Sequence, residues 1–232
     1  MNQILVTDKL YVTQKLRKKK KIYRIEFIAS LVLVFVFLGW YVHSEIQKNA
    51  YESVSQEILD NMDFDDTVAD DKALVVAFDS DAEVVETQLD TVDTASYTDS
   101  NGVTYTYESI LTIPTLGIKY PVLSDTSEDL LKISLNKFWG GSPNAVGNYC
   151  VVGHNYKSGK MFGKLSQIQT GDKVYLQDMS GQKLAYQVYD RYVVYPEDVA
   201  CTSQITNGLK EMTLITCTNG GKQRLVVKCR EV

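Results

Sequence analysis

Apolar residues follow two different patterns along the chain. Between Ile25 and Val42 they form one nearly continuous run, interrupted only by Glu26, Ser30 and a glycine. That run has about the minimum length of a helix that crosses a membrane. From Tyr105 onward the apolar positions come in short stretches separated by turn residues, which predicts many short strands.

The predicted strands cover residues 105–113, 116–123, 147–153, 172–178, 183–195, 211–217 and 223–230. Ser127 to Asn136 is predicted to be a helix, because Ser127 can cap its N-terminus and two acidic residues follow in the first turn. Single helical turns are expected at 161–165 and 197–201. Antiparallel strands with a few short helices favour a mostly β fold that closes into a barrel.

The last two predicted strands form a hairpin. Thr213 to Cys217 reads as a buried strand, and the cluster of small and polar residues that follows must turn. In the next strand Leu225, Val227 and Cys229 point to one side, while Arg224, Val226, Lys228 and Arg230 point to the other. Because the turn is short, the strands are expected to pair antiparallel, with Arg224 close to Cys217.

The charge is distributed unevenly, although the net charge is only −5. Residues 1–24 are basic, and they directly precede the apolar run, with Trp40 and Tyr41 at its far end. This order predicts a membrane anchor with a cytoplasmic N-terminus and an extracellular C-terminal part. A cleaved signal peptide is the alternative. The long basic region and the poor cleavage site at Val42-His43-Ser44 argue against it.

Four segments are therefore expected: a cytoplasmic basic segment (1–24), a transmembrane anchor (25–43), an acidic stalk (44–102) and a folded domain (103–232). Glu45 to Met62 could continue the anchor as a helix. Beyond it, like charges and few apolar residues favour a flexible chain. Leu74 to Phe78 is a short apolar island that could dock on the domain. No calcium-loop pattern occurs among the acidic residues.

The candidate chemistry comes from three residues near strand ends. The chain has two histidines, and His43 lies at the end of the membrane run, so only His154 can act together with a thiol in the folded domain. A cysteine attacks a carbonyl, a histidine moves protons and a guanidinium holds an oxyanion. Cys217, His154 and Arg224 therefore predict an acyl-transfer site, with Arg230 as the competing arginine.

Four cysteines occur, Cys150, Cys201, Cys217 and Cys229, and none are spaced as Cys-x-x-Cys. A zinc site is not expected, since only one usable histidine accompanies them. Two disulfides would be ordinary in an exported domain. The alternative is that Cys150 and Cys229, which fall in apolar strand patterns, are small buried hydrophobic residues.

The chain resembles the sortases, the cysteine transpeptidases of Gram-positive bacterial surfaces. The family motif Thr-Leu-x-Thr-Cys is matched by Thr213, Leu214, Thr216 and Cys217. The family histidine after a glycine is matched at Gly153-His154, and the family arginine at Arg224-Leu225-Val226-Val227. Residues 113–122 also resemble the family's early strands. The resemblance covers roughly residues 107 to 230.

The resemblance implies a closed sortase-type β-barrel of about eight strands, behind a single transmembrane helix. It implies that Cys217, His154 and Arg224 are catalytic. Thr216 is expected to hold the substrate backbone or simply to favour the strand, and Asn155 to orient the imidazole or cap a turn. Leu116, Tyr120 and Val194 are expected in the substrate groove by resemblance alone.

The implied reaction has two steps and needs no cofactor or metal. Cys217 cleaves a C-terminal sorting signal of a surface protein, and an amine of the cell wall or of another protein then takes the acyl group. A hydrolase using water, or an inactive surface-binding module, are the alternatives. Gly153-His154-Asn155 followed by Met161-Phe162 resembles class B, whereas the short stretch from Val194 to Met212 resembles class D. The absence of an obvious second membrane segment near the C-terminus argues against the pilus-building class.

Overall fold

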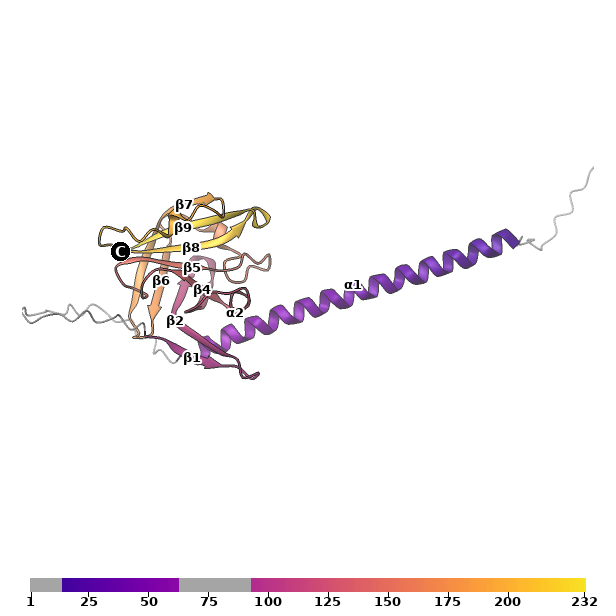
Figure 1. The fold of residues 1–232 in the computed structure, drawn as a ribbon, viewed down its shortest axis with the longest axis horizontal. Coiled ribbons are helices and arrows are strands. Elements are labelled where there is room, and N and C mark those ends of the chain that lie inside the picture. The colour runs from indigo at the N-terminus through magenta and orange to yellow at the C-terminus, as the bar shows by residue number, and fades with distance from the viewer. Residues whose placement is uncertain (1–13, 63–92) are drawn as a thin grey trace, which may run out of the picture. The chain divides into compact units, whose positions relative to one another are not determined.

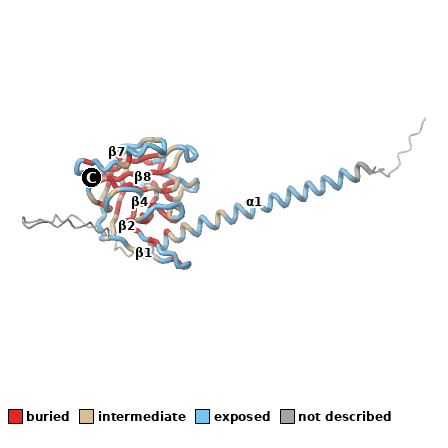
Figure 2. Tube along the Cα trace, viewed as in Figure 1, coloured by how far each residue is buried: buried red, intermediate tan, exposed pale blue. Residues whose placement is uncertain are grey.

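The computed structural model describes residues 14–62 and 93–232 (Figure 1). The chain divides into two compact units, residues 1–49 and residues 50–232. The first unit contains most of helix α1 (Gln14–Asp60). Its apolar side chains between Ile22 and Ile46 are exposed (Figure 2). Among the described residues, α1 is the one helix long and apolar enough to cross a membrane, as the sequence predicted.

The second unit is a β-barrel. Its strands are β1 (Ala95–Thr98), β2 (Thr104–Ile113), β3 (Ile118–Leu123), β4 (Leu135–Trp139), β5 (Gly147–Val152), β6 (Lys173–Asp178), β7 (Lys183–Val194), β8 (Lys210–Thr218) and β9 (Gln223–Glu231). They pair in the order β1-β2-β3-β4-β5-β8-β9-β7-β6, and β6 pairs again with β2. Strands β2 to β9 therefore form a closed ring of eight, which confirms the predicted barrel, and β1 lies outside the ring.

The short helices only partly follow the expectation. The helix predicted over 127–136 shrinks to α2 (Leu130–Ile133), although Ser127 Oγ does accept a hydrogen bond from the Leu130 N–H at 3.1 Å. The chain then becomes β4, which pairs with β3 and β5. Tertiary pairing overrides the local helix signal here. The other short helices of the described residues are 3₁₀ helices: η1 (Pro114–Leu116), η2 (Leu165–Gln167), η3 (Ala200–Thr202) and η4 (Asn219–Gly221).

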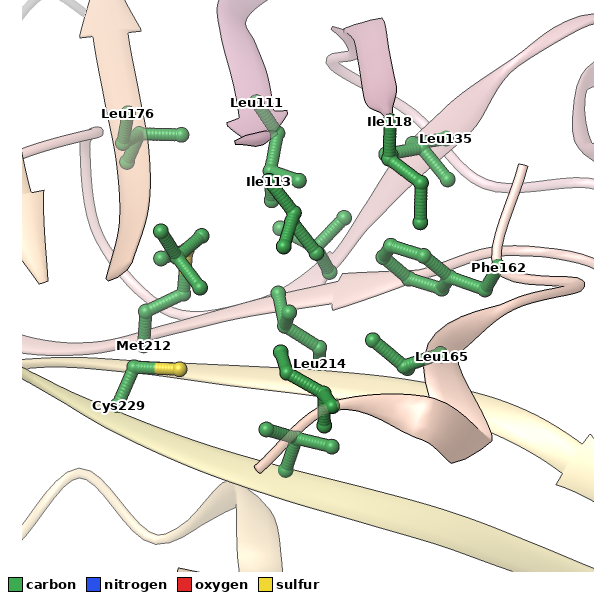
Figure 3. Close-up of a cluster of buried hydrophobic side chains, with 14 of the residues drawn as sticks. Leu111, Ile113, Ile118, Leu135, Phe162, Leu165, Leu176, Met212, Leu214 and Cys229 are labelled. Atoms are coloured by element: carbon green, nitrogen blue, oxygen red, sulfur yellow. The ribbon is translucent and has the colours of Figure 1, made fainter. Parts of the chain in front are cut away.

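The main core fills the inside of the barrel. Alternation along β8 and β9 directs Met212 and Leu214, and then Leu225, Val227 and Cys229, into this core. Figure 3 shows several of these side chains converging with others from β2, β3 and β6. The outward residues of the same two strands, Ile215 and Val226, belong to a separate small cluster with Cys201. The two faces of the hairpin predicted from the alternation are therefore present.

The expected stalk (44–102) requires a correction, because its described parts pack on the barrel. Ile58 of α1 is fully buried in a second cluster with Tyr105 and Leu123. The hydroxyls of Ser55 and Ser134, both buried, lie 3.2 Å apart, and β1 pairs with β2. The apolar island Leu74 to Phe78 and most acidic residues of the expected stalk lie outside the described residues.

Candidate active site

Cys217 and Arg224 face each other across the β8–β9 hairpin. They are paired in the antiparallel register, so their side chains project from the same face with Cβ atoms about 5 Å apart. This is the outer face, since neighbouring Thr216 and Leu225 point inward and are buried. Asn219, Gly220 and Gly221 all have positive φ, which closes the turn between the two strands.

Strand β5 brings His154 to the same end of the sheet. It runs parallel to β8 with Val152 opposite Ile215, so two residues further on, His154 comes level with Cys217. Two hydrogen bonds hold this end: the Gly153 N–H donates to the Ile215 carbonyl at 3.2 Å, and Thr216 Oγ1 donates to the Gly153 carbonyl at 2.7 Å. A Cβ at position 153 would collide with Leu135 and Phe162, which explains the glycine before the histidine.

His154 is half-buried, and its pKa lies below the ordinary histidine value because burial disfavours the charged ring. Glu128 raises this pKa and Lys132 lowers it, both by smaller amounts. The ring packs against Tyr156, with centroids 5.1 Å apart. Among the described residues no carboxylate is hydrogen-bonded to the imidazole. The neutral form is therefore favoured at neutral pH, as a group that first accepts a proton requires.

Asn155 and Thr216 make contacts that the sequence did not suggest. Asn155 Nδ2 donates to the Cys217 carbonyl at 2.8 Å, so it ties the histidine loop to the strand that carries the cysteine. The Thr216 hydroxyl points into the barrel toward Gly153, as described above. Both contacts fix the backbone around Cys217. A direct contact of either side chain with a substrate stays a prediction.

The three expected groove residues lie in different places. Val194 ends β7 and pairs with Arg224 in the β7–β9 register. Leu116 and Tyr120 are instead members of the buried main core, so their expected contact with a substrate stays a prediction that their burial does not favour. Strand position explains the difference, because of the three only Val194 lies on a strand next to the one that carries Arg224.

The two candidate arginines have different partners. Arg224 Nη1 donates to the carbonyls of Gly221 and Gln223, at 2.8 and 3.1 Å. Among the described residues no acid pairs with it, and no hydrogen bond engages its Nε or Nη2. Arg230, in contrast, donates twice to Glu211, at 2.7 and 3.1 Å. Of the two, Arg224 is the arginine whose charge is not paired with an acid among the described residues.

An apolar hollow of about 110 Å³ lies next to Arg224. Ile215, Val194 and Val152 line it on the outer face of the sheet, and Pro196 and Val199 of the β7–β8 connection line it as well. Phe138 of β4 also lines this hollow. The sequence reading missed Phe138, Pro196 and Val199. Apolar residues in an otherwise polar connection were the available signal for the last two.

All four cysteines are free thiols. Cys150, Cys201 and Cys229 are buried, and burial raises the pKa of each thiol, that of Cys150 to about 12. Cys217 alone is partly exposed. The two-disulfide alternative is therefore not realised in this structure, and the three buried thiols are held in the form that is a poor nucleophile.

Comparison with known proteins gives one family. The family described as the Sortase domain matches residues 111–232, more than half of the chain. No curated protein matches the chain. Among solved structures, sortase A from Corynebacterium diphtheriae is similar with a TM-score of 0.51 and 25% identity, over 55% of this chain and 61% of that one.

Two further structures are comparable. A pilus-related sortase C of Group B Streptococcus has a TM-score of 0.50 and 25% identity, covering 54% of this chain and 67% of its own. A sortase D5 transpeptidase of Clostridium perfringens has a TM-score of 0.50 and 24% identity, covering 54% and 79%. The last likeness concerns the fold alone. The chain spans about three fifths of the Corynebacterium protein.

Proposed function

Because this chain belongs to the sortase family, we propose that it is a cysteine transpeptidase whose nucleophile is Cys217. The observation that carries the proposal is the outward cross-strand pair of Cys217 and Arg224, level with His154 at the end of β5. A partly exposed thiol, a neutral imidazole and an acid-free guanidinium beside an apolar hollow suit acyl transfer from a peptide.

In the first step the Cys217 sulfur attacks a substrate carbonyl carbon while His154 takes the thiol proton. The carbonyl oxygen becomes an oxyanion, and Arg224 can hold it with the N–H groups that no other described residue uses. The tetrahedral species then collapses. The carbon–nitrogen bond breaks, His154 returns the proton to the leaving amine, and a thioester to Cys217 remains.

In the second step an acceptor amine attacks the thioester. His154 takes a proton from the attacking nitrogen, the carbon–sulfur bond breaks, and the proton returns to the Cys217 sulfur. A new amide forms and the enzyme is regenerated with no net change in oxidation state. If water attacks instead, the product is a carboxylic acid. Hydrolysis with the same residues is therefore the second candidate activity.

The proposed substrates are surface proteins that carry a C-terminal sorting signal, and the proposed acceptor is an amine of the cell wall or of another protein. The apolar hollow of Val194, Ile215 and Val199 supports recognition of an apolar peptide segment. The connection between β7 and β8 spans residues 195–209 and contains only the 3₁₀ turn η3. Its shortness supports the expected class D or class B-like assignment.

We further place the N-terminus in the cytoplasm and the barrel outside the cell. The exposed apolar stretch of α1 and the basic residues Lys18 to Lys21 before it support this orientation. Protease added to intact, wall-stripped cells should digest the barrel. Protection of the barrel until the membrane is opened would reverse the orientation.

The function is tested by trapping the thioester. Full-length protein in detergent is mixed with a peptide that it cleaves, selected from a random library, and the intact mass is measured after an acid quench. An acyl adduct on Cys217, absent in Cys217→Ala, is expected. An adduct on another cysteine would overturn the assignment. Products formed with and without added amine distinguish the transpeptidase from the hydrolase, and a protein that forms no adduct with any peptide would be a binding module.

A further inference from the structure

A second hollow, about 380 Å³ in volume, lies beside the first. The two share Phe138 of β4. They also share the β7–β8 connection, which contributes Thr202 to the first hollow and Gln204 to the second. The second hollow contains none of the three residues assigned to catalysis. The two hollows are therefore neighbours that meet at Phe138, and Arg224 lines the first of them.

Exposed aromatic side chains border this second hollow. Phe138 is 45% exposed and Trp139 is 59% exposed. An irregularity in the β4–β5 register falls between Lys137 and Trp139, and such bulges change the direction in which a side chain points. Next to it, Gly140 has a φ of 105° and lies so close to the Asn148 carbonyl that no Cβ would fit. The backbone at this strand end thus presents both rings to the solvent.

The walls of the second hollow are held in place by buried contacts. Lys137 pairs with Glu108 at 3.2 Å, and their side chains are only 16% and 2% exposed. Gln204 bonds twice to the backbone of Asn148: its side-chain oxygen accepts from the N–H at 3.1 Å, and its amide donates to the carbonyl at 2.9 Å. A preformed pocket binds without a large ordering cost.

The hollow also has a polar part. Ser124, Asp125 and Thr126 line it beside the aromatic rings, although the Ser124 hydroxyl itself is inaccessible to solvent. Apolar rings next to polar residues suit a peptide segment in an extended conformation.

The chemistry decides which part of a substrate reaches this hollow. The acyl part of the substrate stays on the enzyme through both steps, whereas the leaving amine must depart so that the acceptor can enter. A groove that holds the acyl part therefore acts in both steps, and the apolar hollow beside Arg224 suits this part of the substrate. Residues still further upstream of the scissile bond then pass Phe138.

Resting on the proposed function, we infer that the hollow between Phe138, Trp139 and Gln204 is an upstream subsite, which binds an apolar or aromatic residue on the N-terminal side of the sorting signal. The subsite lengthens recognition beyond the segment that occupies the groove beside Cys217. The Trp139 ring supplies most of the contact area, because aromatic rings contribute large apolar surfaces to interfaces.

Peptide length tests the inference. A library-selected peptide is used in a short form and in a form extended upstream by residues that include one phenylalanine. The extension should raise kcat/KM of the full-length protein in detergent about tenfold, a typical effect of one aromatic anchor. Trp139→Ala should abolish this gain and leave turnover of the short peptide unchanged. Val103→Ala, which removes an exposed apolar side chain in the β1–β2 turn, should leave the gain intact.

Each other result has a distinct meaning. Equal loss on short and extended peptides would assign Trp139 to the groove beside Cys217, and no loss would remove the subsite. If wild-type protein forms no thioester with the short peptide, the proposed function fails instead.

Fluorescence provides a second measurement. The chain has two tryptophans, Trp40 and Trp139, so Trp40→Phe leaves Trp139 as the only tryptophan, which can be excited selectively over the tyrosines. In that background, with Cys217→Ala to prevent turnover, the extended peptide should shift the emission to the blue as the ring leaves water. The short peptide should not shift it. Equal spectra with both peptides would contradict the subsite.

Discussion

The β8–β9 hairpin carries an arginine at each end, and the two ends differ in what faces it. At one end Arg230 is paired in register with Glu211, and at the other Arg224 is paired with Cys217. Glu211 is buried and also accepts a hydrogen bond from Tyr189 at 3.2 Å, with Lys228 3.8 Å away. Arg224 has only backbone carbonyls as partners.

The two ends of the β8–β9 hairpin therefore differ in their electrostatic environment. At the Glu211 end the buried carboxylate is paired with both Arg230 and Lys228, which suits a structural contact. At the Cys217 end the positive charge lacks an internal counter-charge among the described residues, so it can interact with an oxyanion. The same strand alternation places both pairs on the outer face, and the residue opposite each arginine is what differs.

The largest expected effect is the difference in peptide cleavage between the Arg224→Lys and Arg230→Lys variants. Arg224→Lys keeps the charge but loses the planar fork that can hold an oxyanion. Peptide cleavage should fall about 10²–10³-fold, the usual loss for an oxyanion donor. Arg230→Lys should change kcat/KM little. An inactive Arg230→Lys protein together with normal turnover by Arg224→Lys would contradict the assignment of the oxyanion contact to Arg224.

Removing the acid at the Glu211 end should affect stability instead. Glu211→Gln leaves Arg230 and Lys228 facing a neutral side chain, and we expect a loss of about 2 kcal/mol in the free energy of unfolding. Urea denaturation measures it, with Glu197→Gln in the exposed β7–β8 connection as the control. Turnover of the folded protein should be unchanged. A stable but inactive Glu211→Gln protein would contradict the division of roles.

A smaller effect is expected where α1 contacts Tyr120 of β3. Tyr120 donates to Glu52 at 2.7 Å, and the Met161 backbone N–H also bonds to this phenol. Met161 pairs with Asn155, the residue that holds the Cys217 carbonyl. Tyr120→Phe removes the link between α1 and this loop.

We expect Tyr120→Phe to cost about 1.5 kcal/mol of stability and to lower kcat severalfold, with acyl-enzyme formation still on Cys217. Tyr97→Phe is a matched control, because Tyr97 donates to Glu57 of the same helix at 2.6 Å but belongs to β1. Equal kinetic loss in both variants would mean that α1 supports the barrel generally, without a specific path to the histidine loop.

The sequence predicted the parts of the fold that depend on short-range pattern. Alternation of Leu225, Val227 and Cys229, followed through a tight turn, placed Arg224 opposite Cys217, because a two-stranded register needs no distant information. Strand β4 was missed because the Ser127 cap looked like a helix start, while its pairing with β3 and β5 is a tertiary property. The exposure of Phe138 and Trp139 depends on the same unpredicted strand.

The packing of α1 on the barrel could have been predicted from the amino-acid sequence. Tyr51, Val54 and Ile58 are spaced as one face of a helix, and all three belong to the cluster that packs on the barrel. The acidic residues around them concealed this face. The partners of Asn155 and Thr216 could not have been predicted, since both bonds join strands that come together only in the closed barrel.

The smallest expected effect concerns the charge of His154. At the Glu211 end every charge has a partner, whereas the imidazole at the Cys217 end is governed mainly by burial, which lowers its pKa. Its titration followed by NMR should therefore have a midpoint below the ordinary value of about 6.5. With only two histidines in the chain, His154→Ala identifies the signal.

The sign of the linked stability change follows from the same shift. Below pH about 6.5 the unfolded chain binds the His154 proton more readily than the folded protein does, so stability is lost as pH falls through this range. His154→Gln should make the unfolding free energy less dependent on pH there. A midpoint above 6.5 in the free protein would mean that attraction to a negative charge outweighs burial, and His154 would then not be the neutral proton acceptor of the first step.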